Sequence, residues 1–197
     1  MGWFVFVLVA VVIVAPYIWY ALIVTRRNRV SEALAGVDVQ LQQRHDLIPN
    51  VLTTARRFME HERALFDGIT ELRNKAHTTA GSRDFATAGE RFEIERQIDT
   101  GMGRLFALAE NYPALKSEGP MMEAQRAYSE VEANISAARR FYNSALAELR
   151  NITEIFPGTL LKGMAGVTVI PPFFETSEAV RAPVDAARHL GAPDRPA

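Results

Sequence analysis

The chain has 197 residues, and its 22 basic and 23 acidic residues leave a formal net charge of -1. This balance argues against a nucleic-acid-binding surface, which would be strongly basic, so we expect no nucleic-acid partner. The absence of cysteine excludes disulfides, thiolate metal sites and cysteine nucleophiles.

The first predicted element is a transmembrane anchor within residues 1–25. From Trp3 to Val24 the chain is apolar almost without interruption, and about 20 such residues suffice for a helix to cross a hydrocarbon core. A cleaved signal peptide is the alternative interpretation. Such a peptide would begin with a basic region, and no basic residue precedes Trp3. We therefore favour a single membrane-spanning helix.

The end of this segment carries residue types that settle at a membrane surface. These predicted interface residues are Tyr17, Trp19, Tyr20, Arg26, Arg27 and Arg29. Because the arginines follow the span and none precedes it, the positive-inside rule predicts an outside N-terminus and a cytoplasmic body. The lipid bilayer is therefore the first expected partner.

The chain between residues 26 and 157 is predicted to be all-α. Apolar residues recur with alternating spacings of three and four from Leu34 to Ala76 and from Met121 to Phe156, which indicates helix faces that pack on neighbours. Pro49 leaves the register of the first stripe unchanged, so we expect a kinked but continuous helix there. The prediction is a long antiparallel, coiled-coil-like bundle of three to four helices, at about 28–78, 84–112 and 121–156.

Two segments follow the predicted bundle. Residues 158–175 form an apolar loop interrupted by Gly and Pro, too short and broken to span a membrane. Phe173 and Phe174 are its candidate contact residues, with lipid, with another subunit or with the bundle itself. Residues 176–197 are rich in Ala and Pro and are expected to be a disordered tail.

Two charged residues, Arg44 and Glu62, occupy positions of the first apolar stripe, where an unpaired charge is costly. On one helix they would lie about 27 Å apart, so we expect their partners on other helices. Glu110, Glu132 and Arg139 are the first candidates. Such charges either fix the register of the helices, as polar core residues do in coiled coils, or form a functional polar cluster.

Motifs for metal binding and catalysis are weak in this sequence. His45 beside Asp46 and His61 beside Glu62 lack the i, i+4 spacing of zinc motifs, so we predict no metal and no other cofactor. The sequence has no Gly-rich phosphate loop, no G-x-S-x-G and no H-E-x-x-H, so we predict no catalytic residues and do not expect an enzyme.

Several short motifs are more specific: QLQQRHDLIPN (40–50), ENYPALKS (110–117), EANISAARRFYNSALAEL (132–149), IFPG (155–158) and PPFFE (171–175). Together they resemble the LemA family of bacterial membrane proteins, over about residues 17–176. The resemblance implies an anchor in the bacterial inner membrane and a long helical bundle. It implies no catalytic residues, and one branch of the family is associated with the formation of magnetosome membranes. The motifs of this resemblance and the charges on the apolar stripe together give the candidate interaction residues: Arg44, His45, Asp46, Asn50, Glu62, Glu110, Glu132, Arg139 and Asn143.

Three functions compete at this point. The leading hypothesis is that the anchored helices form homo-oligomers that organise or shape the membrane, because long helices with surplus apolar surface favour self-association. The alternative is an adaptor or sensor, in which Arg44, Glu62 and the loop from Gly158 to Phe174 bind another membrane protein such as a protease. An enzyme would need a pocket that gathers Arg44, Glu62, Glu110 and Arg139, and it ranks last.

Overall fold

The computed structural model describes residues 2–79, 85–116 and 118–175. Within these ranges helices are the only regular elements, so the predicted all-α class is confirmed. The predicted tail at 176–197 lies outside the described residues. In chain order the elements are α1 (Gly2–Arg56), the 3-10 turn η1 (Glu60–Glu62), α2 (Arg63–Thr79), α3 (Ala88–Ala109), α4 (Pro113–Lys116), α5 (Gly119–Glu154) and α6 (Gly158–Leu161).

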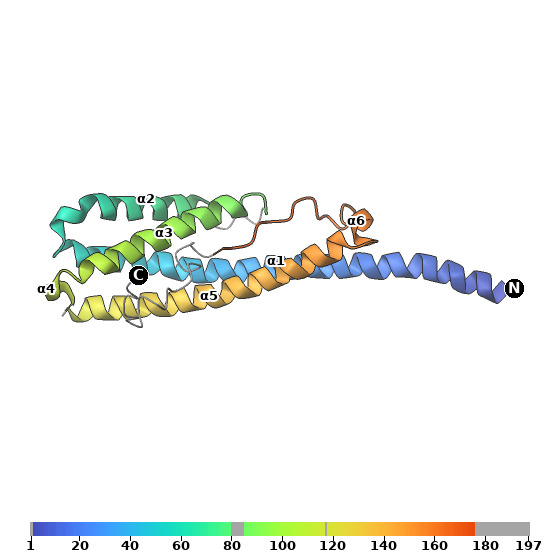
Figure 1. Ribbon diagram of the computed structural model, residues 1–197, viewed down its shortest axis with the longest axis horizontal. Helices are drawn as coiled ribbons and strands as arrows, with labels where there is room; N and C mark the ends of the chain where they lie inside the picture. Colours follow the sequence, from blue (N-terminus) through green and yellow to red (C-terminus); the bar gives the residue numbers. More distant parts are fainter. Residues whose placement is uncertain (1, 80–84, 117, 176–197) are drawn as a thin grey trace, which may run out of the picture.

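Helix α1 dominates the architecture. Its 55 residues make it about 80 Å long, and its N-terminal part projects alone beyond the other helices (Figure 1). Its length and apolar composition are sufficient to cross a membrane, and only 6% of its most apolar window is buried. The rest of α1 pairs with α5, which lies antiparallel beside it, while α2 and α3 form a hairpin on one side of that pair (Figure 1).

The predicted single helix over 28–78 is wrong, because the chain turns back after Arg56. At the turn, Met59 leaves the helical conformation, with φ -122° and ψ 54°, and its side chain is fully buried. The next helix, α2, runs back and buries Phe66 and Ile69 in the same core as Met59. A straight continuation would leave those apolar side chains in water, at a cost of about 2 kcal/mol each. The other two predicted helices are confirmed, as α3 and α5.

Pro49 lies inside α1 without ending it, as predicted. Proline has no N–H group, so the carbonyl of His45, four residues earlier, loses its helical hydrogen-bond partner. Arg73 of α2 replaces that partner, since its Nε donates to the His45 oxygen at 2.8 Å. The proline therefore creates an acceptor on α1 that α2 uses for docking.

The buried apolar side chains form two clusters along the bundle. One lies towards the projecting end and joins α1, α5 and the start of α3 to the segment after α6, with Leu34, Tyr142 and Phe174 among its members. The other lies at the far end and joins α1, α2, α3 and the start of α5, with Ile48, Phe66 and Ile98 among its members.

Candidate functional site

The main polar feature is a buried ion-pair cluster of Arg44, Glu95, Glu132 and His45, which comes from α1, α3 and α5. Arg44 of α1 donates from Nη1 to Glu132 Oε1 at 3.0 Å and from Nη2 to the Glu95 backbone oxygen at 3.1 Å. Its guanidinium also pairs directly with the Glu95 carboxylate. The Arg44 and Glu95 side chains are 3% and 6% exposed and that of Glu132 is 28% exposed, so water screens the Arg44–Glu95 pair little.

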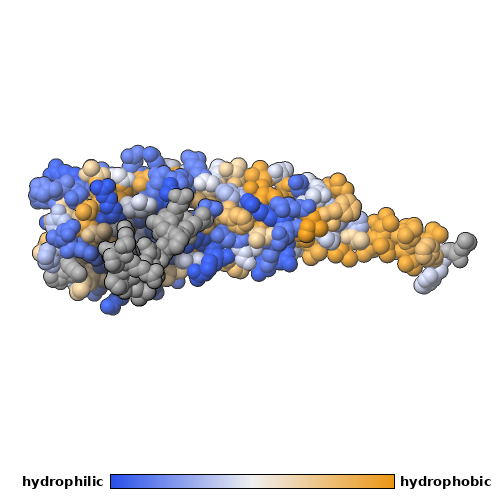
Figure 2. Space-filling model, viewed as in Figure 1, coloured by the Kyte–Doolittle hydropathy of each residue, from blue (hydrophilic) through white to orange (hydrophobic). Residues whose placement is uncertain are grey.

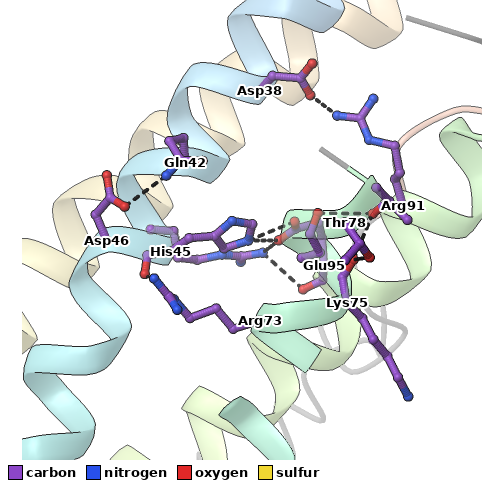
Figure 3. A network of polar contacts seen from close by, with 12 residues as sticks. Asp38, Gln42, His45, Asp46, Arg73, Lys75, Thr78, Arg91 and Glu95 are labelled. Carbon is purple, nitrogen blue, oxygen red and sulfur yellow. Dashed lines mark hydrogen bonds and ion pairs between the residues drawn. The ribbon is translucent and has the colours of Figure 1, made fainter. Parts of the chain in front are cut away.

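His45 completes the cluster from the same helix. Its Nε2 lies 2.9 Å from Glu95 Oε1, and Figure 3 shows the imidazole directed at that carboxylate. About two turns earlier on α1, Asp38 forms an ion pair with Arg91 of α3. Two consecutive side chains of α1 thus hold one carboxylate of α3, while a second ion pair joins the same two helices.

The charges in the cluster depend on one another. Burial opposes ionisation of Glu95, but the hydrogen bond from His45 and the positive charge of Arg44 outweigh it and lower the pKa of Glu95 below its usual value. Burial likewise opposes the charge on Arg44, but the surrounding acidic groups, Tyr128, Glu95 and Glu132, raise its pKa. Tyr128 is itself a neutral phenol at neutral pH, because burial raises its pKa. The two carboxylates therefore supply the counter-charge for Arg44.

The cluster lies between the two apolar clusters of the core. Along α1, Arg44 follows Leu41 of the first cluster and precedes Ile48 of the second; along α3, Glu95 lies in the same way between Phe92 and Ile98. A charged layer at this level penalises any helix that slides along its neighbour, since a slipped register would leave a buried charge without its partner.

Other predicted polar residues lie outside the cluster. Asp46 is exposed and accepts a hydrogen bond from Gln42 at 2.9 Å. Asn50 is exposed, and so is Glu110, directly after α3. Glu62 is in η1 beyond the end of α1, so its predicted core position is wrong. Of the predicted partners for Arg44, Glu132 is correct.

Arg139 and Asn143 of α5 act elsewhere, on the segment that follows α6. Asn143 makes two hydrogen bonds to the backbone of Phe174, from Nδ2 to the oxygen at 3.0 Å and from the Phe174 N–H to Oδ1 at 2.9 Å. Arg139 lies over the Phe174 ring, 5.7 Å from its centroid. The ring stacks on Phe92 at 4.2 Å, so Phe174 is a core residue that fastens the end of the loop to α3 and α5.

Phe173 also packs on the bundle. Arg150 lies over the Phe173 ring at 4.4 Å and donates to the Pro171 oxygen at 3.1 Å. The sequence left open whether Phe173 and Phe174 contact lipid, another subunit or the bundle. In the structure both side chains pack on the bundle.

The predicted membrane-interface residues make contacts with protein as well. Arg26 and Arg29 both pair with Glu148 of α5, and Arg27 donates to the Ala165 oxygen at 3.0 Å. Trp19 donates from Nε1 to the Ile152 oxygen at 3.4 Å. Tyr17 and Tyr20 remain exposed on α1.

Glu95 and Arg91 were missed in the sequence. The apolar positions of the helix predicted at 84–112 run Phe85, Ala88, Phe92, Ile98 and Met102, and Glu95 lies in the gap between Phe92 and Ile98, three residues from each. A charge on a helix stripe was the signal that singled out Arg44, and it would have found Glu95 too. Arg91 carried the same signal, because it lies three residues after Ala88 and four before Glu95 and so keeps the alternating spacing of three and four.

The space around the cluster is small. Cavities of about 20 Å³ and 30 Å³ adjoin it on two sides, which is room for one or two water molecules and no larger ligand. Within residues 2–79, 85–116 and 118–175, no three His, Asp or Glu side chains converge as a metal site would require. The arrangement can hold helices in register, and it offers no binding cleft.

The fold and these contacts define a class: an all-α bundle of long helices whose first helix extends as a long apolar segment. The chain belongs to the LemA family, whose model matches residues 33–186. The match covers most of the chain and begins after the apolar part of α1. A search of curated proteins found no significant match.

Proposed function

We propose that this protein is a single-pass membrane scaffold whose bundles associate side by side through a groove between α1 and α5. In this proposal the apolar end of α1 spans a bacterial inner membrane, with the N-terminus outside and the bundle in the cytoplasm, as the arginines after the span favour. The assembled bundles would organise or shape the membrane to which they are attached.

The exposure of α1 supports the membrane-spanning part of the proposal. A core helix of a soluble protein would be mostly covered by neighbouring helices, whereas large side chains such as Trp3, Phe6 and Val12 are exposed and need an apolar environment. A cleaved signal peptide is a poorer explanation, because Trp19 and Ile23 of the same apolar segment contact α5 or lie in the bundle core.

The groove supports self-association and is the observation that carries the proposal. It has a volume of about 550 Å³ and is lined by Glu32, Ala33, Gly36, Gln40, Asn134, Ala137, Ala138 and Phe141. Small residues on both walls let another helix approach closely, and Val39 and Phe141 expose large apolar side chains on the same two helices. A second copy of the chain would cover this apolar surface and supply a matching groove in a two-fold arrangement.

The competing functions receive less support. An adaptor that binds its partner through Arg44 would need that side chain at the surface, but it is buried and paired with Glu95 and Glu132. An enzyme would need a pocket beside the charged residues, where the cavities hold only about one or two waters. We therefore propose a non-enzymatic role, without cofactor, in which the ion-pair cluster sets helix register.

Cysteine cross-linking tests the groove directly, because the chain has no native cysteine. Ala137→Cys places a thiol on the groove wall, and Arg104→Cys places a control thiol on the exposed surface of α3. We expect oxidation in native membranes to give covalent dimers with Ala137→Cys and not with Arg104→Cys. Equal cross-linking at both positions, or none at either, would contradict the proposal.

A second variant separates the groove from general aggregation. A Cβ atom added at Gly36 would meet nothing within 4 Å in the monomer, and Gly36 lines the open groove, so Gly36→Leu should fold normally and fill the groove. We expect it to reduce Ala137→Cys cross-linking while the circular dichroism spectrum stays unchanged. Undiminished cross-linking would show that the copies meet on another face.

A further inference from the structure

The segment from Ile155 to Val169, which we call the α6 corner, sits where α5 ends beside α1 (Figure 1). Sequence patterns group it with the loop that ends at Phe174, but the structure divides that loop in two. The part from Pro171 onwards is fastened to α5 by the bonds from Asn143 and Arg150. The α6 corner instead turns large apolar side chains outwards.

The exposed side chains of the corner are Ile155, Phe156, Leu160 and Met164, with exposed fractions of 58%, 74%, 72% and 76%. The apolar residues just before them on α5, Leu146 and Leu149, are fully buried. Figure 2 shows hydrophobic atoms continuing from the projecting helix onto this end of the bundle. A contiguous exposed apolar patch of this kind marks a contact with another apolar phase or partner.

The corner is held firmly against one level of α1. Trp19 donates a hydrogen bond to the Ile152 oxygen in the last turn of α5. Arg27 donates one to the Ala165 oxygen within the corner. Gly158 lies so close to α5 that a Cβ atom there would be 1.8 Å from the Ile152 oxygen and 3.0 Å from Trp19 Nε1. Only glycine fits this approach, so the position of α6 beside α1 is built into the sequence.

That level of α1 is where apolar residues give way to charged ones. Trp19 and Arg27 are about 12 Å apart along the helix, and between them the apolar stretch ends at Val24 and the first arginine follows at Arg26. In a membrane-spanning helix this transition lies at the boundary between acyl chains and headgroups. The apolar patch of the corner therefore faces the depth at which lipid begins.

We propose that the α6 corner is a second membrane-contact site, in which Ile155, Phe156, Leu160 and Met164 insert into the boundary between headgroups and acyl chains of the leaflet that the bundle faces. The inference rests on the proposed membrane span of α1. Continuity of the patch with the apolar surface of α1 identifies lipid as the occupant. Lys162, the one charged residue between Ile155 and Val169, is exposed and can reach the headgroups from this position.

Depth-dependent fluorescence quenching tests the site in the full-length chain, reconstituted into vesicles of phosphatidylethanolamine and phosphatidylglycerol. Leu160→Cys or Met164→Cys is labelled with an environment-sensitive fluorophore, and nitroxide lipids carry the quencher near the headgroup or near the acyl-chain end. Thr100→Cys, exposed on α3, is the control outside the bilayer. Val12→Cys, exposed on the apolar part of α1, is the control inside it.

We expect the corner labels to lose fluorescence most with the shallow quencher, the Val12 label with the deep one, and the Thr100 label with neither. Quenching at Val12 without quenching at Leu160 or Met164 would overturn the second contact while the span of α1 stands. No quenching at Val12 would overturn the span and the inference with it. Corner labels that escape lipid quenching but become shielded as protein density rises would show that a second copy covers the patch, which also overturns the proposal.

Discussion

The substitution Arg44→Met should destabilise the bundle strongly. It removes the cation from an ion pair whose side chains are 3% and 6% exposed and leaves the Glu95 carboxylate buried with His45 as its remaining side-chain partner in the cluster. Removing one partner of a buried pair costs about 3–5 kcal/mol. For a chain of this size that cost corresponds to a fall in the unfolding midpoint of about 6–20 °C.

Thermal unfolding of the full chain in detergent micelles, followed by circular dichroism, measures this effect. Lys75→Met is the matched control, because it removes a cation from the exposed pair of Lys75 and Glu71 on α2, and we expect no measurable shift. The double variant Arg44→Met/Glu95→Met should recover part of the loss, since no buried carboxylate is then left alone on α3. An Arg44→Met protein as stable as the wild type would refute the view that this cluster is a coupled buried network.

Three further predictions concern the same contacts. The pKa of Glu95 is lowered in the folded state, so ionisation of this carboxyl stabilises the fold above its usual pKa of 4.5. That contribution is lost as the pH falls below 4.5. The difference in unfolding free energy between wild type and Glu95→Gln, measured by denaturant titration, should therefore be largest at neutral pH and shrink below pH 4.5. Arg73→Met should lower the free energy of unfolding by about 1–3 kcal/mol, because it leaves the His45 carbonyl without a hydrogen-bond donor. The loss should be smaller in a Pro49→Ala background, where the N–H of residue 49 can donate to that carbonyl. Equal losses in the two backgrounds of a double-mutant cycle would count against this account. Asn143→Ala removes both hydrogen bonds to the Phe174 backbone. It should speed hydrogen exchange of the Phe174 amide while leaving amide exchange in α2 unchanged. A Phe174 amide protected as well as in the wild type would show that ring packing alone holds the segment.

Much of the fold follows from the spacing of apolar residues. The stripe from Met121 to Phe156 predicts α5 to within two residues at each end, because a long helix with one buried face has a clear 3.6-residue period. The same reasoning identified Arg44 as a charge that needs a partner on another helix, and Glu132 as one of the candidates.

The turn after Arg56 could not be predicted in the same way. No Gly or Pro lies between Arg56 and Arg63, so the two clearest signals for the end of a helix are absent. In addition, the end of α1 and the start of α2 pack on the same core. Across the turn their predicted apolar positions keep the same alternating spacing of three and four, from Ala55 to Ile69. A local pattern of this kind cannot distinguish one long helix from two that fold back, since the difference depends on which neighbours are available to cover the apolar face.

The candidate site could be predicted only in part from the sequence, for a related reason. Asp46, Asn50 and Glu110 stand out in their motifs, yet all three are exposed. Short motifs do not say which side of a helix faces inwards, whereas the stripe does. The stripe positions hold Arg44 and Glu95, and these are the residues that the three helices enclose.

The unbroken course of α1 has a mechanical consequence. Because one helix runs from Gly2 to Arg56, no loop separates the proposed span from the bundle, and the orientation of the span is passed to the bundle along a continuous helix. From Val24 to Arg56 the helix extends about 48 Å, so a tilt of about 20° in the bilayer would displace its far end sideways by about 16 Å. In the proposed assembly, changes in bilayer thickness that alter the tilt would thereby alter the distance between neighbouring bundles.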